Sequence, residues 1–199
     1  MKITGIKQQV KRPDRYSVFV EGKYSFSLSE TALLDTKLVN GQELTPKEVR
    51  EYKQLSTDDK LYNLALGYVA LRPRSKWEIE FYLERKKASP ALKEQILNKL
   101  SNIGLIDDEK FAQAFVNDRR LLRPTSRRKL SLELRKKRVA DEVIEAALGS
   151  DPAEEQTALR DIIERKLRQT KYQDNLKLMQ YLARQGFSYG DIKSALQKE

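Results

Sequence analysis

The sequence predicts a mostly α-helical, elongated protein in which three tandem three-helix units follow a small antiparallel β-hairpin or sheet domain. Apolar and polar residues alternate strictly only near the start of the chain, and helix start and stop signals recur after residue 57. One segment also resembles another at a fixed distance along the chain. We expect a hairpin domain with short helices over residues 1–56, followed by three-helix units over 57–106, 107–150 and 151–199.

Alternation of apolar and polar residues over residues 1–30 predicts β-strands. Two alternating runs are joined by Glu21-Gly22, a two-residue connection whose glycine tolerates a positive φ. A further strand before them should end at Pro13-Asp14. The alternating residues are Ile3, Ile6 and Val10 in this first strand, Tyr16, Val18 and Val20 in the next, and Tyr24, Phe26 and Leu28 in the last.

Capping signals then mark the helices. Ser29 should cap a short helix over 29–35. Thr45, followed by proline and then by Glu48, should open a longer helix that breaks near Ser56 before the first repeat helix over 58–71. Ser75 and Glu78 form a capping box for the next helix. Its apolar side should carry Trp77 and Phe81, with Tyr82 or Leu83 beside them.

The repeat is visible in the sequence itself. Residues 71–75 (LRPRS) recur as residues 122–126 (LRPTS), 51 positions later. Leu83 matches Leu134 at the same offset of 51, later apolar positions match at an offset of 48, and a weaker third copy follows at 48. The matched sets are Leu83, Leu134 and Leu182; Ile96, Ile144 and Ile192; and Leu100, Leu148 and Leu196. One such unit buries little apolar area alone, so we expect neighbouring units to pack together.

The net charge of +10 is divided almost evenly over the domains, but this even division hides a local basic excess. Residues 119–138 contain ten basic residues and one acid, Glu133. A charge of this density favours a polyanion or an acidic protein surface as partner, although a solvated helix face that keeps the protein soluble is the alternative. The candidate partner-binding or DNA-binding residues lie at the first and second joints: Arg72, Arg74, Arg119, Arg120, Arg123, Arg127, Arg128, Lys129, Arg135 and Lys136.

Residues for common catalytic and metal chemistry are lacking. The chain has no histidine and no cysteine, and its eight glycines form no phosphate-binding loop. We therefore expect a protein that is not an enzyme and that uses no cofactor or metal. The absence of cysteine, of a long apolar run and of an apolar signal region at Met1 predicts a cytoplasmic protein without a membrane anchor.

Three motifs each allow a structural and a functional interpretation. The acids of residues 107–109 suit a helix N-terminus, which we prefer to a divalent-metal site. Ser126 is read as a helix cap rather than a nucleophile. The aromatic residues Trp77, Phe81 and Tyr82 are read as a core stripe rather than a platform for stacking nucleic-acid bases.

Residues 104–119 (GLIDDEKFAQAFVNDR), residues 133–137 (ELRKK) and residues 72–78 (RPRSKWE) resemble the signature of the bacterial RecX regulators of recombination. The stretch 29–41 and the hairpin before it resemble the longer members of that family. The resemblance implies a monomeric protein without catalytic activity that binds the RecA recombinase filament on single-stranded DNA. Such a protein inhibits strand exchange, ATP hydrolysis and the co-protease activity behind the SOS response.

Two departures from the family pattern affect the joints. Where the family commonly ends the second helix of a unit in Lys-Gly, this chain has Lys87-Ala88 and Lys137-Arg138, and only Gln185-Gly186 keeps the glycine. We expect the first two joints to close differently from the third, because a left-handed turn strains a residue with a β-carbon. The third unit has the smallest net charge and no proline joint, so we expect it to act as a cap or a separate protein contact.

Two other functions stay open from the residues alone. The protein could bind nucleic acid directly through its basic strip without RecA, or it could be a structural adaptor for an acidic protein.

Overall fold

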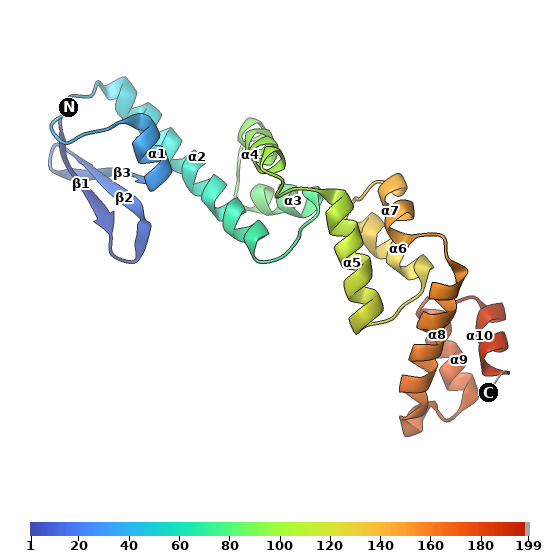
Figure 1. The fold of residues 1–199 in the computed structure, drawn as a ribbon. Coiled ribbons are helices and arrows are strands. Elements are labelled where there is room, and N and C mark those ends of the chain that lie inside the picture. The colour runs from blue at the N-terminus through green and yellow to red at the C-terminus, as the bar shows by residue number, and fades with distance from the viewer. Residues whose placement is uncertain (198–199) are drawn as a thin grey trace. The chain divides into compact units, whose positions relative to one another are not determined.

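The computed structural model describes residues 1–197 and divides them into two compact units. Of the described residues, the first unit contains 1–71 and 80–100, and the second contains 72–79 and 101–197. Helices dominate, with one small sheet at the N-terminus, as Figure 1 shows. Within the described range, none of the helices combines the length and the apolar character that crossing a membrane requires.

The sheet is a three-stranded antiparallel meander of β1 (Ile3–Gln9), β2 (Arg12–Val20) and β3 (Lys23–Ser29). Glu21 and Gly22 form the β2–β3 turn with φ of 50° and 75°, as the sequence predicts. The other turn lies at Val10, which is 99% exposed, so the prediction that β1 runs to Pro13 is wrong. Pro13 lies inside β2, at an irregularity of the β1–β2 pairing and beyond the end of β3, where its missing N–H costs no ladder hydrogen bond.

Two helices cover this sheet. Ser29 caps α1 (Glu30–Thr36) by accepting from the Ala32 amide at 3.2 Å. A capping box of Thr45 and Glu48 opens α2 (Pro46–Ala70). The core between helices and sheet contains Ile3, Val18, Val20, Phe26, Leu28, Leu38, Leu44 and Val49.

Helix α2 is continuous, so the expected break near Ser56 is wrong. The Ser56 hydroxyl donates to the Ser27 carbonyl at 2.6 Å and accepts from the Ser27 amide at 3.3 Å, which uses it against the sheet instead of as a cap. One turn later, Asp59 pairs with buried Arg15 of β2 at 3.0 Å. These contacts hold the first half of α2 on the sheet.

Helices α3 (Lys76–Arg85) and α4 (Pro90–Asn102) continue the chain. Ser75 and Glu78 form the predicted capping box, with both backbone hydrogen bonds at 3.2 Å. The buried face of α3 carries Ile79 and Leu83, and Trp77 is half-buried, whereas Phe81 is 47% exposed, so the prediction that Phe81 lies on the apolar side is wrong. Residues two apart on a helix point about 200° from each other, which places Phe81 opposite Ile79.

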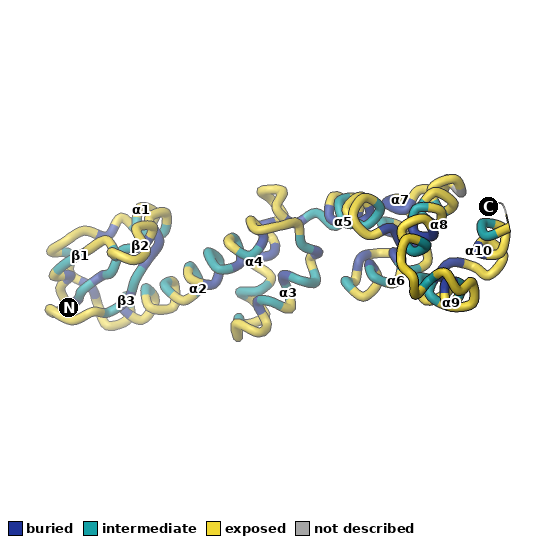
Figure 2. The backbone as a smooth tube through the Cα atoms, turned by 90° about the horizontal axis from the view of Figure 1, so that it is seen from below, coloured by how far each residue is buried: buried dark blue, intermediate teal, exposed yellow. Residues whose placement is uncertain are grey.

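The second unit contains two further helical modules. The middle module consists of α5 (Asp108–Leu122), α6 (Arg127–Lys136) and α7 (Asp141–Leu148). The third consists of α8 (Pro152–Leu167), the 3-10 turn η1 (Thr170–Tyr172), α9 (Asn175–Arg184) and α10 (Tyr189–Leu196). The matched apolar positions form the cores: Leu134, Ile144 and Leu148 are at most 1% exposed, as are Leu182 and Ile192. Figure 2 shows such buried residues at intervals along the helices. The four-part division of the chain stays a prediction.

The second helix of each repeat ends in the same left-handed turn, a Schellman motif. In each turn an amide donates back to the repeated buried leucine: Ala88 to Leu83 at 3.1 Å, Val139 to Leu134 at 3.3 Å and Phe187 to Leu182 at 3.4 Å. The left-handed residues are Lys87 (φ 61°), Arg138 (φ 55°) and Gly186 (φ 93°). The expectation that two joints close differently is therefore wrong. The repeated packing outweighs the roughly 1 kcal/mol that a β-carbon costs in this conformation.

Candidate polyanion-binding surface

The basic cluster of the middle module is positioned by a buried joint between α5 and α6. Pro124, Thr125 and Ser126 are all buried. The Ser126 hydroxyl accepts from the Lys129 amide at 3.1 Å, which confirms its predicted role as the cap of α6. The same hydroxyl donates to the Gln185 carbonyl of the third module at 2.7 Å. The start of α6 is thereby attached to the end of α9.

The glycine next to Gln185 fits closely against this joint. A β-carbon built on Gly186 would lie 2.4 Å from the Ser126 hydroxyl oxygen and 3.4 Å from the β-carbon of Lys129. Gln185 also contacts the cluster, because its side-chain oxygen accepts from the Lys129 ammonium at 2.7 Å. Modules two and three therefore meet at a contact that has no space for a larger residue.

Two of the predicted binding arginines are neutralised inside the protein. Arg120 donates to the Leu148 carbonyl at 2.7 Å and to Glu154 at 3.1 Å. Arg127 pairs with Glu145 at 2.5 Å through its side chain, and its amide donates to Glu155 at 2.7 Å. The side chain of Arg120 joins the end of α7 to the start of α8, which favours a role in holding the two modules together, whereas the side chain of Arg127 pairs within the middle module.

The carboxylate of Glu155 has an altered pKa in this setting. Burial raises the pKa of Glu155 above its ordinary value, and the hydrogen bond from the Arg127 amide opposes the rise. The nearby carboxylate of Asp191 adds to the rise, while the charges of Arg127 and Arg120 counter it. The contact between α6 and α8 therefore carries a group that resists ionisation.

The remaining side of the joint is a basic groove between modules two and three. We use the name basic groove for a cavity of about 420 Å³ in which five cations and one acid contribute to the lining. The charged lining residues are Arg119, Arg123, Lys129, Glu133, Arg165 and Lys166. Three of these cations, Arg119, Arg123 and Lys129, belong to the predicted set, and the fold brings them together.

The contacts inside the basic groove leave most of its positive charge uncompensated. Arg119 pairs with Glu133 at 3.1 Å and lies over the Phe115 ring, 5.0 Å from its centroid. Lys129 is held by a neutral amide, as described above. Lys166 lies 4.6 Å from the centroid of Tyr181, which also lines the groove.

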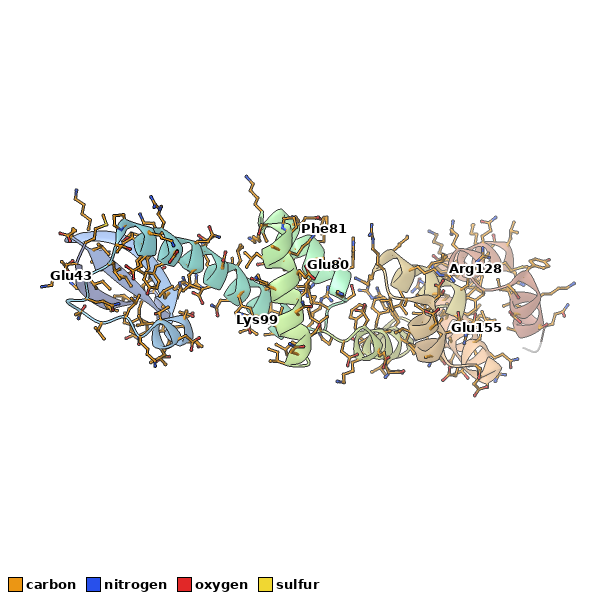
Figure 3. The ribbon with its side chains drawn as sticks, turned by 90° about the horizontal axis from the view of Figure 1, so that it is seen from above. Glu43, Glu80, Phe81, Lys99, Arg128 and Glu155 are labelled. Carbon is orange, nitrogen blue, oxygen red and sulfur yellow. The ribbon has the colours of Figure 1, made fainter. Side chains whose placement is uncertain are left out.

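The outer face of α6 carries the rest of the predicted residues of the middle module. Arg128 is exposed and makes no ion pair within residues 1–197; Figure 3 labels it on α6. Arg135 pairs with Asp141 at 2.8 Å, and both side chains are more than half exposed, so this pair is weak. Lys136 is exposed beside it.

Comparison with known proteins decides the family. Family models match residues 1–45 as the regulatory protein RecX N-terminal domain, residues 107–148 as the second RecX three-helix domain and residues 153–196 as the third. The regulatory protein RecX of Bacillus subtilis is 31% identical over 200 residues, which cover 98% of this chain and 75% of that protein. The chain belongs to the RecX family.

Further RecX proteins are similar to this chain in sequence or in structure. Regulatory protein RecX of Lactobacillus johnsonii is 32% identical over 146 residues, but the alignment covers only 54% of that protein and 73% of this chain. A crystal structure of regulatory protein RecX matches with a TM-score of 0.72 and 26% identity over 98% of both chains. A second, of RecX from Lactobacillus salivarius, matches with a TM-score of 0.60 over 71% of this chain and 96% of that one. In the division of the RecX models, the basic groove lies between the second and third three-helix domains.

The first joint holds its predicted residues in a different way. Glu78 accepts from Arg72 at 3.0 Å and from Lys137, at the end of α6, at 2.8 Å. Burial alone would raise the pKa of Glu78, but hydrogen bonds from Arg72, Lys137 and the Ser75 amide lower it overall. Arg74 is partly buried and makes a contact within the protein. Arg72 therefore contributes to an internal ion-pair network.

The acidic run of residues 107–109 also has internal partners. Asp107 caps α5 by accepting from the Lys110 amide at 2.9 Å, and this hydrogen bond lowers the pKa of Asp107. Asp108 accepts from the Lys76 amide at the start of α3 at 2.8 Å. The capping interpretation of this run is confirmed.

Sequence reasoning missed the contribution of the third RecX domain to the basic groove. Arg165 and Lys166 lie in the last turn of α8, and Tyr181 lies on α9. Nearly balanced charge over residues 151–199 hid these residues. The adjacent pair Arg165-Lys166 could have indicated this contribution. It lies in the last turn of α8, as Arg119-Arg120 lies in the last turn of α5.

Proposed function

We propose that this RecX family protein regulates the RecA recombinase by binding the RecA filament on single-stranded DNA, without catalysis. It binds as a cytoplasmic monomer and inhibits recombinase, ATPase and co-protease activity. The observation that carries the proposal is the exposed face of α6, where Arg128 and Lys136 project without an ion pair within the described residues and Arg135 has only an exposed partner. Family membership supports the regulatory role.

The chemistry of this face suits an anionic filament surface. Arginine guanidinium groups form paired hydrogen bonds with carboxylates and phosphates, and a filament on DNA presents both. Arg128 and Arg135 lie seven residues apart, so they project from the same side of α6, about two turns from each other. Leu130 and Leu134 anchor the opposite side in the core. The charges are thereby displayed on a rigid helix.

Charge reversal tests the proposal. Arg128→Glu with Arg135→Glu should reduce co-sedimentation of the protein with RecA filaments on single-stranded DNA by about tenfold, because attraction becomes repulsion at two sites. Arg160→Glu is the control, since Arg160 is exposed on α8, lies outside α6 and does not line the basic groove. Equal losses in both variants, or an unchanged double variant with an intact circular dichroism spectrum, would contradict the proposed role of this face.

Direct binding of nucleic acid without RecA is the second candidate function. The basic groove favours it, because five cations surround a space that a narrow anionic chain can enter. Tight, steeply salt-dependent DNA binding in the absence of RecA, together with no effect of the chain on RecA ATP hydrolysis, would support this candidate.

A further inference from the structure

We propose that the basic groove between the second and third modules binds the phosphate backbone of a single strand of DNA. This inference rests on the proposed function only in that the RecA filament supplies the strand. It assigns to the third module a direct part in binding, where the sequence alone suggested a cap or a separate protein contact.

The groove carries a large excess of positive charge. Arg123 and Arg165 make no ion pair within residues 1–197, and both are exposed. Lys129 donates to the neutral side chain of Gln185, and Lys166 lies over tyrosine rings, so neither ammonium meets a carboxylate there. Glu133 is the one acid among the lining residues, and its carboxylate accepts a hydrogen bond from the Nε of Arg119. Four of the five cations therefore lack a counter-ion.

The cations of the groove are distributed over three helices. They come from the end of α5, the first turn of α6 and the last turn of α8. A ligand that carries one charge per unit of its chain can engage several of them at once, and releasing counter-ions from each phosphate adds to the affinity. A single small anion would neutralise only part of this charge.

The size and the uncharged lining of the groove suit a single strand. A cavity of about 420 Å³ has room for part of a single strand. Leu122, which is 67% exposed, and Pro124 offer apolar surface to sugars and bases. Gln169, Gln185 and Tyr181 offer hydrogen-bonding groups that match the edges of bases.

The second and third modules build the groove jointly. The third module positions Lys129 through Gln185, and it holds the Ser126 cap from which the first turn of α6 begins. The groove wall opposite is α8 of the third module itself. The site therefore exists only while the two modules remain in contact.

The test is direct binding of a fluorescein-labelled dT15 oligonucleotide to the full chain, measured by fluorescence anisotropy without RecA. Arg123→Glu and Arg165→Glu should each weaken binding by about tenfold, while the matched variant Arg160→Glu should change it less than about twofold. The slope of log affinity against log salt should become shallower by about 0.7 for each phosphate contact removed. Both groove arginines are exposed and unpaired within the described residues, so thermal unfolding should be unchanged.

Two results would overturn the inference. One is dT15 binding by both groove variants within twofold of the original chain. The other is tight binding of a labelled ten-residue polyglutamate that Arg165→Glu abolishes while dT15 binding persists, which would assign the groove to an acidic peptide.

Inhibition of RecA ATP hydrolysis, measured in parallel on the original chain, separates the two proposals. If the original chain fails to inhibit while the dT15 pattern holds, the proposed function fails and the groove stands. If it inhibits while the groove variants bind dT15 normally, the groove fails and the proposed function stands.

Discussion

Replacing Gly186 by alanine should separate the second and third modules. Gly186 has φ of 93°, and an added β-carbon would lie 2.4 Å from the hydroxyl oxygen of Ser126. Ser126 is fully buried, and its hydroxyl makes two hydrogen bonds, one to each side of the module contact. The methyl group therefore cannot be accommodated unless Ser126 gives up its position.

Three contributions determine how much Gly186→Ala lowers the free energy of unfolding. A β-carbon in the left-handed region costs about 1 kcal/mol, which Lys87 and Arg138 already bear at equivalent turns. Loss of the hydrogen bond from Ser126 to Gln185 costs about 0.5–1.5 kcal/mol. Loss of the α6 cap costs about 1 kcal/mol. Gly186→Ala should thus lower the free energy of unfolding of the second compact unit by about 2.5–3.5 kcal/mol.

Urea unfolding followed by far-ultraviolet circular dichroism measures this change. Gly104→Ala is the matched control, because Gly104 has φ of 74° with open space around its added β-carbon, so it should lose only about 1 kcal/mol. Ser126→Gly removes the hydroxyl, and Gly186→Ala in that background should also cost only about 1 kcal/mol. Equal losses for Gly186→Ala and Gly104→Ala, or no coupling between positions 126 and 186, would refute the reasoning.

Two further predictions concern single side chains. Lys87→Gly should raise the free energy of unfolding by about 0.5 kcal/mol, because relief of left-handed strain exceeds the added flexibility of the unfolded chain; a lower urea midpoint would contradict this. Glu155→Gln should stabilise the protein at pH 7, where the buried carboxylate is ionised at a cost, and should keep an acceptor for the Arg127 amide. The pKa of Glu155 is higher in the folded protein than in the unfolded chain, so as pH falls the folded protein is the first to protonate this carboxylate. Protonation removes the cost of burying the charge. The extra stability of Glu155→Gln over the original chain should therefore shrink as pH falls from the raised pKa to the ordinary value of 4.5. An advantage that is equal at pH 7 and pH 4 in urea unfolding would show that burial of charge is not its cause.

Much of the fold could be predicted because it depends on local signals. The caps at Ser29, Ser75, Asp107 and Ser126 satisfy orphan amides within three residues, so sequence spacing alone identifies them. The repeated leucines lie at matched positions because each repeat buries the same face. Errors arose where a distant segment decided the outcome. Ser56 contacts a strand 29 residues earlier, and Ile79 rather than Phe81 faces the core.

The candidate surface was only partly predictable for the same reason. Arg128 stands on an exposed helix face that periodicity alone locates. The partners of Arg120 and Arg127 include acids 34 and 18 residues away, and no spacing rule connects them. Arg165 joins Arg123 in one groove only through packing of separate modules. Charge density in the sequence located the middle module, but packing determines which charges remain available.

The central claim is that this RecX family protein acts on the RecA filament. Its most direct test is the rate of ATP hydrolysis by RecA from the same source on single-stranded DNA, measured as the purified full chain is added. The account predicts that hydrolysis slows at substoichiometric to near-stoichiometric amounts of the chain. An unchanged rate across modest salt concentrations, with DNA saturated by RecA, would contradict it.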